Sequence, residues 1–204
     1  MFAMMTGYLD DSYNPSTVAC GGWIARDDVW DRILPKWDKR IALETRISVK
    51  RGLKPIRRYK ASDCALRVND FDSWGLNRQI NFTKRLVEIM TAHPRHELPM
   101  VFAWGISLAE IYEVEPDATR RYSTNRAYQF CAQRCFEEIA HIMHEYYSDE
   151  KITFIHDDGE KYSYALAGFK DATDRKNAGM DQLITIAPMA WASVNTQNRP
   201  YMIT

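Results

Sequence analysis

The chain alternates between stretches with a strand-like pattern of apolar residues and stretches with a helical one. Residues 4–11 and 17–25 are apolar runs separated by Asn14-Pro15-Ser16, a turn sequence, and together they predict a β-hairpin. The pair Gly21-Gly22 in the second run indicates either a bulge or the close approach of another backbone. Three more apolar runs predict strands, at 100–114, 151–156 and 183–192. The longest of them is expected at the centre of a sheet.

Apolar residues spaced three and four apart predict three helices, over 28–45, 76–92 and 125–147. Pro35 lies inside the first pattern and predicts a kink or a restart there. The polar segment 168–182 is expected to be exposed and mobile. Strands and helices interspersed in this way predict an α/β fold, and we expect one domain over residues 1–204.

Composition excludes several classes of protein. Lys+Arg and Asp+Glu number 27 each, so the net charge of zero argues against a protein that coats nucleic acid through bulk charge, although a local basic patch stays compatible with it. Four cysteines are too few for a disulfide framework in 204 residues, and we expect core thiols. No window approaches ~18 uninterrupted apolar residues, and the short apolar start has no basic segment typical of a signal peptide. We therefore expect a cytoplasmic protein without membrane contact.

Two of the predicted strands end in acidic residues. Asp10-Asp11 ends the first strand, and Asp157-Asp158 follows the strand at 151–156. If these strands are parallel neighbours, Asp10 and Asp157 face each other at the carboxyl edge of the sheet, where α/β proteins usually bind ligands. Clustered carboxylates favour Mg²⁺ or Mn²⁺, and such ions support hydrolysis of phosphodiesters. The alternative is that both acidic segments are only turns, because Asp, Ser and Gly are turn residues.

Several short motifs resemble a large bacterial family, catalogued as domain of unknown function 3800. They are Tyr8-Leu9-Asp10-Asp11-Ser12, Gly21-Gly22-Trp23-Ile24-Ala25, Lys60-Ala61-Ser62-Asp63 and Phe154-Ile155-His156-Asp157-Asp158-Gly159. The resemblance implies an RNase H-like mixed sheet flanked by helices, with an inserted helical segment after the first hairpin. It also implies a metal site, for a family without a settled activity.

The resemblance also implies roles for individual residues. Asp10 is expected to be the first metal ligand and Asp157 the second, with Asp158 as a near alternative; Asp11 stands where the family usually has Glu. The residues expected to be catalytic are Asp10, Asp11 and Asp157. Ser12, Lys60 and Asp63 are expected from the resemblance to contact the substrate, and Arg57 and Arg58 are expected to do so as part of the basic stretch at residues 46–60.

One departure concerns the C-terminal residues. The family continues after its last strand with a Pro-Leu-Gln-x-Ala-Asp segment and a helix, whereas Pro200 is followed here by Tyr201-Met202. We therefore expect a weakened or inactive site that lacks one metal ligand. Three carboxylates are candidates to replace it, with no argument for one over the others: Glu137, Glu138 and Asp181.

Residues 46–60 carry seven basic residues and no acidic one. They predict contacts with a phosphate backbone, with Tyr59 stacking on a base. The alternative is a solvated helix face or loop. His156, beside the second acidic segment, is either a proton shuttle or a structural residue at a strand end.

Two hypotheses follow. The first is a metal-dependent nuclease or phosphodiesterase that holds Mg²⁺ or Mn²⁺ and acts on DNA or RNA. The second is a catalytically inactive module of the same fold that binds nucleic acid or protein. A homo-oligomer is also expected, because a sheet without a closing helix exposes apolar surface.

Overall fold

The structure is a computed structural model, and it describes residues 4–94, 97, 99–114, 120–147, 150–156, 160–176 and 184–188. The described residues form two compact units. Those up to Ile24 and those from Val101 onward make the sheet unit, and those from Ala25 to Met100 make the helical unit. The predicted insertion of a helical segment after the first hairpin is confirmed, and the assignment of the whole chain to a single domain stays a prediction.

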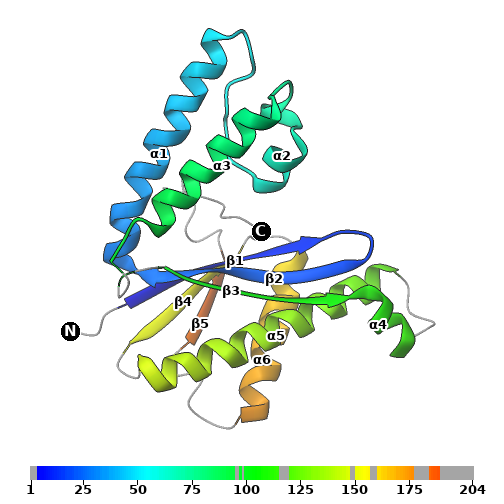
Figure 1. The fold of residues 1–204 in the computed structure, drawn as a ribbon. Coiled ribbons are helices and arrows are strands. Elements are labelled where there is room, and N and C mark those ends of the chain that lie inside the picture. The colour runs from blue at the N-terminus through cyan, green and yellow to red at the C-terminus, as the bar shows by residue number, and fades with distance from the viewer. Residues whose placement is uncertain are drawn as a thin grey trace. The chain divides into compact units, whose positions relative to one another are not determined.

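The sheet unit is built on five strands, coloured from blue to orange in Figure 1. They are β1 (Met4–Tyr13), β2 (Thr17–Arg26), β3 (Met100–Ser107), β4 (Lys151–His156) and β5 (Ile184–Pro188). Their order across the sheet is β3-β2-β1-β4-β5.

The first half of the sheet is antiparallel. A loop of three residues joins β1 to β2, and the side chain of Asn14 closes it by accepting hydrogen bonds from the backbone N–H groups of Ser16 and Thr17. Gly22 of β2 lies so close to the carbonyl of Tyr8 in β1 that a Cβ atom would overlap it. Of the two alternatives for the glycine pair, close backbone approach is therefore confirmed.

The second half of the sheet is parallel. β1 pairs with β4 from Met4↔Lys151 to Leu9↔His156, and β4 pairs in turn with β5. The pairing ends where β4 ends, at His156, whereas β1 runs on beyond Leu9 to Tyr13, so the prediction that Asp10-Asp11 ends the first strand was wrong. The sequence left open whether the first strand and the strand at 151–156 are parallel neighbours, and the structure shows that they are. The mixed α/β sheet is confirmed.

The predicted central strand at 100–114 was wrong in both length and place. β3 ends at Ser107, and α4 (Leu108–Val114) follows. The hydroxyl of Ser107 accepts a hydrogen bond from the backbone N–H of Ala109, which is how a serine caps the start of a helix. β3 lies at one edge of the sheet, and Val101 and Trp104 are exposed on it, so its apolar run does not reflect burial on both faces.

Two long helices pack on one face of the sheet, α5 (Arg120–Tyr146) and α6 (Glu160–Lys176), as Figure 1 shows. Phe136 of α5 contacts Phe154 of β4 and Phe169 of α6 edge to face, with ring centroids 5.3 Å and 5.4 Å apart. The prediction of a mobile, exposed segment at 168–182 was wrong for residues 168–176, which belong to α6. Gly168 is buried against the backbone of Gln129, so the glycine allows two helices to approach closely rather than marking a loop.

The helical unit contains α1 (Asp27–Lys50), α2 (Ala61–Leu66), a short 3-10 helix η1 (Asn69–Phe71) and α3 (Leu76–Thr91). α1 continues through Pro35 without a restart. The core of the helical unit is aromatic. Neighbouring rings in it meet mostly edge to face, and they belong to Trp37, Tyr59, Phe71, Trp74 and Phe82. This core gives the helical unit a hydrophobic interior of its own.

Two predictions about chain chemistry can be checked against the fold. All four cysteines are free and buried, which confirms them as core thiols. Among the helices that the structure describes, none is long and apolar enough to cross a membrane.

Candidate functional site

Asp10 lies where the paired parts of β1 and β4 end. It directly follows Leu9, the last residue of β1 that pairs with β4, and the partner of Leu9 is His156. The Asp10 side chain is half-buried, and its Oδ1 atom accepts a hydrogen bond of 2.9 Å from the backbone N–H of Asp11. Asp11 and Ser12 are also half-buried within β1, which runs on to Tyr13. The alternative that Asp10-Asp11-Ser12 forms a turn was therefore wrong.

A buried pair of polar side chains lies beside these carboxylates. The hydroxyl of Tyr128, on α5, is 2.6 Å from Nε2 of His156, at the end of β4, and both side chains are almost wholly buried. Burial raises the pKa of Tyr128 well above its ordinary value, and the hydrogen bond with the Cys20 thiol and the nearby carboxylates of Asp11 and Asp10 raise it further. The Asp10 and Asp11 carboxylates therefore lie within electrostatic range of the tyrosine hydroxyl.

A cation completes this group of side chains. Nζ of Lys161, near the start of α6, donates a hydrogen bond of 2.6 Å to Oδ1 of Asn125. It also lies 5.6 Å from the ring centroid of Tyr128 and 5.9 Å from that of Tyr13. We call the whole group the acidic-end cluster: Asp10, Asp11, Tyr13, Asn125, Tyr128, His156 and Lys161. Four elements supply it, namely β1, α5, β4 and α6.

Several predicted residues lie outside this cluster or outside the described chain. Asp157 and Asp158, the predicted second ligand and its alternative, are outside the described residues, as is Asp181. Glu137 is engaged within α5, where it accepts hydrogen bonds from the side chains of Gln133 and Arg134. His156 is buried and bonded to Tyr128, which agrees with the structural alternative proposed for it.

The chemistry of the cluster suits a hydrated divalent cation. Among the described residues, no group of three or more His, Cys, Asp or Glu side chains gathers closely enough to hold a metal by itself. Mg²⁺, however, usually keeps several waters and needs only one or two protein carboxylates. Asp10 fits such a role, because its oxygens lie at the sheet edge where ligands of α/β proteins bind.

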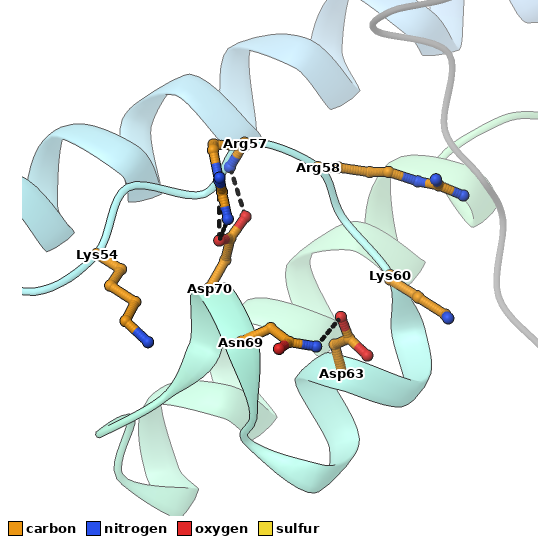
Figure 2. A pocket seen from close by; sticks show the side chains of 7 residues that line it. All are labelled: Lys54, Arg57, Arg58, Lys60, Asp63, Asn69 and Asp70. Carbon is orange, nitrogen blue, oxygen red and sulfur yellow. Dashed lines mark hydrogen bonds and ion pairs between the residues drawn. The ribbon is translucent and has the colours of Figure 1, made fainter.

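A second candidate site lies in the helical unit and is drawn in Figure 2. It is a pocket of about 370 Å³, which we call the basic pocket. Its lining residues are Lys54, Arg57, Arg58, Lys60, Asp63, Asn69 and Asp70. Four of the five predicted substrate-binding residues line this pocket. The remaining one, Ser12, belongs to the sheet unit.

The loop after α1 presents the cations of the basic pocket. Gly52 lies in the left-handed region, with φ 68°, and helps the chain to leave α1 and double back. Ile56 and Tyr59 are buried, and the Thr45 hydroxyl bonds to the carbonyl of Ile56 at 3.0 Å. Since these two residues anchor the loop, Arg57, Arg58 and Lys60 between and after them remain exposed.

Both carboxylates of the basic pocket are engaged by neighbouring donors. Oδ1 of Asp70 accepts hydrogen bonds from Nε and Nη2 of Arg57 at 3.2 Å and 3.0 Å, and its Oδ2 accepts the Arg57 backbone N–H at 2.9 Å. Burial by itself would raise the pKa of Asp70, but these bonds and the arginine charge outweigh it, so the pKa lies below its ordinary value. Asp63 accepts a hydrogen bond of 2.9 Å from the side-chain amide of Asn69.

The predicted stacking role of Tyr59 was wrong. Its ring is 5% exposed and packs edge to face against Trp37, Phe71 and Phe82. Burial raises the pKa of its hydroxyl. Tyr59 belongs to the core, because the loop needs apolar anchors to hold its cations in place.

Sequence reasoning missed Asn125, Tyr128 and Lys161 as members of a polar site. Helical spacing predicts Tyr128 only as part of the apolar stripe of the helix at 125–147, although a tyrosine in such a stripe needs a partner for its hydroxyl. Comparison with known proteins finds no family model and no curated protein that matches the chain. The resemblance to the domain-of-unknown-function 3800 family therefore stays a prediction.

Proposed function

We propose that this protein is a divalent-metal-dependent nuclease or phosphodiesterase that acts on DNA or RNA at the acidic-end cluster. One observation carries the proposal: β1 and β4 are parallel, and their pairing ends at Leu9 and His156, with Asp10 directly after the last paired residue. This is the edge of an α/β sheet that usually binds ligands.

The metal ligands in this proposal come from both strand ends. Asp10 is the first ligand, and Asp157 or Asp158, which follow His156 in the chain, supplies the second. Asp11 assists from within β1. Bound Mg²⁺ or Mn²⁺ would supply an activated water and neutralise charge on the scissile phosphate.

The remaining residues of the cluster act without the metal. The Lys161 ammonium attracts a phosphate group and stabilises the negative charge that develops as the phosphodiester is attacked. Its hydrogen bond to Asn125 holds that ammonium in place. The Tyr128–His156 bond fixes the end of β4 to α5. Ser12, the next residue but one after Asp10, is proposed to contact the substrate.

The test is cleavage of single- and double-stranded DNA and RNA with Mn²⁺, comparing the wild type with Asp10→Asn. Loss of an outer partner of a metal ligand typically costs ~10–100-fold, so loss of the ligand itself should cost more. Asp31→Asn is the matched control, because Asp31 is an exposed carboxylate on α1 in the helical unit. Equal cleavage by the wild type and Asp10→Asn would refute the assignment.

A second candidate function is nucleic-acid binding without catalysis. The basic pocket favours it, since its cations are assembled in the helical unit independently of the carboxylates on β1. Salt-dependent binding by a wild-type protein that cleaves none of the four substrates would establish this function. A cytoplasmic location, with DNA or RNA as the partner, stays part of both proposals.

A further inference from the structure

We infer that the basic pocket binds the phosphate backbone of a nucleic-acid strand. The inference deepens the proposed function, because it names where the helical unit holds the substrate. It rests on the proposed function only in taking the bound phosphates to be those of DNA or RNA. It requires neither the metal nor Asp10.

The first argument is the charge of the basic pocket. Its lining includes four cationic side chains, Lys54, Arg57, Arg58 and Lys60, against the two carboxylates of Asp63 and Asp70. Two positive charges are therefore in excess among the lining residues, or one when Asp72, which pairs with Lys54 at 3.5 Å, is counted with them, in a chain whose Lys+Arg and Asp+Glu are equal in number. An anion is the ligand that such a local excess attracts.

The second argument is that the carboxylates organise the pocket rather than repel the ligand. Asp70 holds the backbone and the guanidinium of Arg57, and Asp63 holds Asn69. Two of the five N–H donors of Arg57 point to Asp70, and the side chain is still 81% exposed. The outer edge of the guanidinium can therefore form the paired hydrogen bonds that arginine makes with phosphate. Because Asp70 fixes Arg57 beforehand, less conformational entropy is lost on binding.

The third argument is the distribution of cations around the pocket. Figure 2 shows Arg58 and Lys60 extending in the same direction from the loop, with Lys54 on the other side of the Arg57–Asp70 pair. Cations on both sides of a central arginine suit a ligand with several linked phosphates better than a single ion. A nucleic-acid backbone has that pattern of charge.

The fourth argument is the backbone beneath the pocket. Arg67, Asn69 and Ser73 have positive φ angles of 56°, 55° and 66° within seven residues. Such conformations are unfavourable for residues other than glycine and cluster at ligand sites, where surrounding contacts maintain them. Here the segment turns sharply and brings Asn69 to Asp63 and Asp70 to Arg57.

The experiment is binding of a fluorescent 20-nucleotide strand, as DNA and as RNA, in EDTA over a range of salt concentrations. The test variant is the double substitution Arg58→Gln with Lys60→Gln, at two exposed side chains. The control is Lys84→Gln, an exposed lysine on α3 of the same unit. Losing two phosphate contacts should weaken binding by ~10-fold or more and reduce the slope of log affinity against log salt by ~1.4, at ~0.7 per contact for a single strand. The control should bind as the wild type.

The outcomes separate this inference from the proposed function. If the double variant binds each strand as tightly as the wild type, and with the same salt slope, the inference is wrong even if Asp10 is needed for cleavage. If the double variant binds weakly and the wild type cleaves nothing, the inference holds and the nuclease proposal fails. Strands with and without a 5′-phosphate, and inorganic phosphate as a competitor, distinguish a terminal from an internal phosphate as the bound group.

Discussion

Tyr128 illustrates how one residue can belong both to a helix's apolar stripe and to a polar site. Its spacing on α5 correctly predicts burial, because a helix presents residues three and four apart on one face. Its partner His156 lies 28 residues later on β4, and no local pattern joins the two. The same holds for Lys161 and Asn125, on α6 and α5. Polar pairs of this kind depend on tertiary packing, so composition and periodicity do not reveal them.

Tyr128→Phe should destabilise the protein. The substitution keeps the ring and removes the hydroxyl bonded to Nε2 of His156, both of them buried. Removing one partner of a buried hydrogen bond costs about 1–3 kcal/mol. Urea denaturation measures the change in the free energy of unfolding. Tyr13→Phe is the control, because the Tyr13 side chain is largely exposed, and an equal loss in both variants would contradict the role of the buried bond.

Asp70 should make stability depend on pH in the acid range. Its pKa is lowered in the folded protein from the ordinary value of 3.8, since the hydrogen bonds and charge of Arg57 together outweigh burial. A lowered pKa gives stability that is present above pH ~4 and is lost as the pH falls through the folded-state value. The wild type should therefore lose stability relative to Asp70→Asn as the pH falls from 4 to 2. Unfolding curves across this range test it, with Asp72→Asn, at an exposed carboxylate, as the control.

At the level of elements, periodicity predicted the strands and helices that local sequence determines, and it failed where helix capping or tertiary packing determines the structure. The hairpin and the helices α1, α3 and α5 were predicted correctly, whereas α6 was not predicted, and the parallel pairing of β1 with β4 was only considered as a possibility. The prediction of one strand over residues 100–114 failed because Ser107, in the middle of this run, caps the start of a helix. The prediction of an exposed, mobile segment failed for residues 168–176 because Gly168 allows two helices to pack closely and does not mark a loop. Of the candidate site, Asp10 and the cations around Arg57 were predictable, because acidic strand ends and basic runs are visible in the sequence.

The packing of α1 on α3 depends on a buried carboxylate. Glu44 of α1 is 5% exposed and accepts hydrogen bonds from Arg40 and from Arg78 of α3. Glu44→Gln removes the countercharge of two partly buried arginines and should cost about 3 kcal/mol of unfolding free energy. The control is Glu88→Gln, whose exposed pair with Arg85 should contribute less than about 1 kcal/mol. Equal losses in denaturant titrations would contradict the structural role of Glu44.

For the molecule as a whole, the proposed binding sites for the metal and for the nucleic-acid backbone lie in different units. The carboxylates at the end of β1 lie in the sheet unit, and the basic pocket lies in the helical unit. A chain of zero net charge can bind a polyanion only if its cations are segregated from its acids, and the basic run at 46–60 provides that segregation. The basic pocket should therefore hold nucleic acid without the metal, whose proposed ligand Asp10 lies in the sheet unit.

Amide hydrogen exchange on the intact protein tests this separation. Mn²⁺ alone should slow exchange at the end of β1, around Asp10, because a ligand stabilises the segment that it binds. The 20-nucleotide strand in EDTA should instead slow exchange across residues 54–70, the segment that contains the residues lining the basic pocket. Asp10→Asn should abolish the first effect and retain the second, and the Arg58→Gln, Lys60→Gln variant should do the reverse. Protection of residues 54–70 by Mn²⁺, or of β1 alone by the strand, would contradict the assignment of the two ligands to separate units.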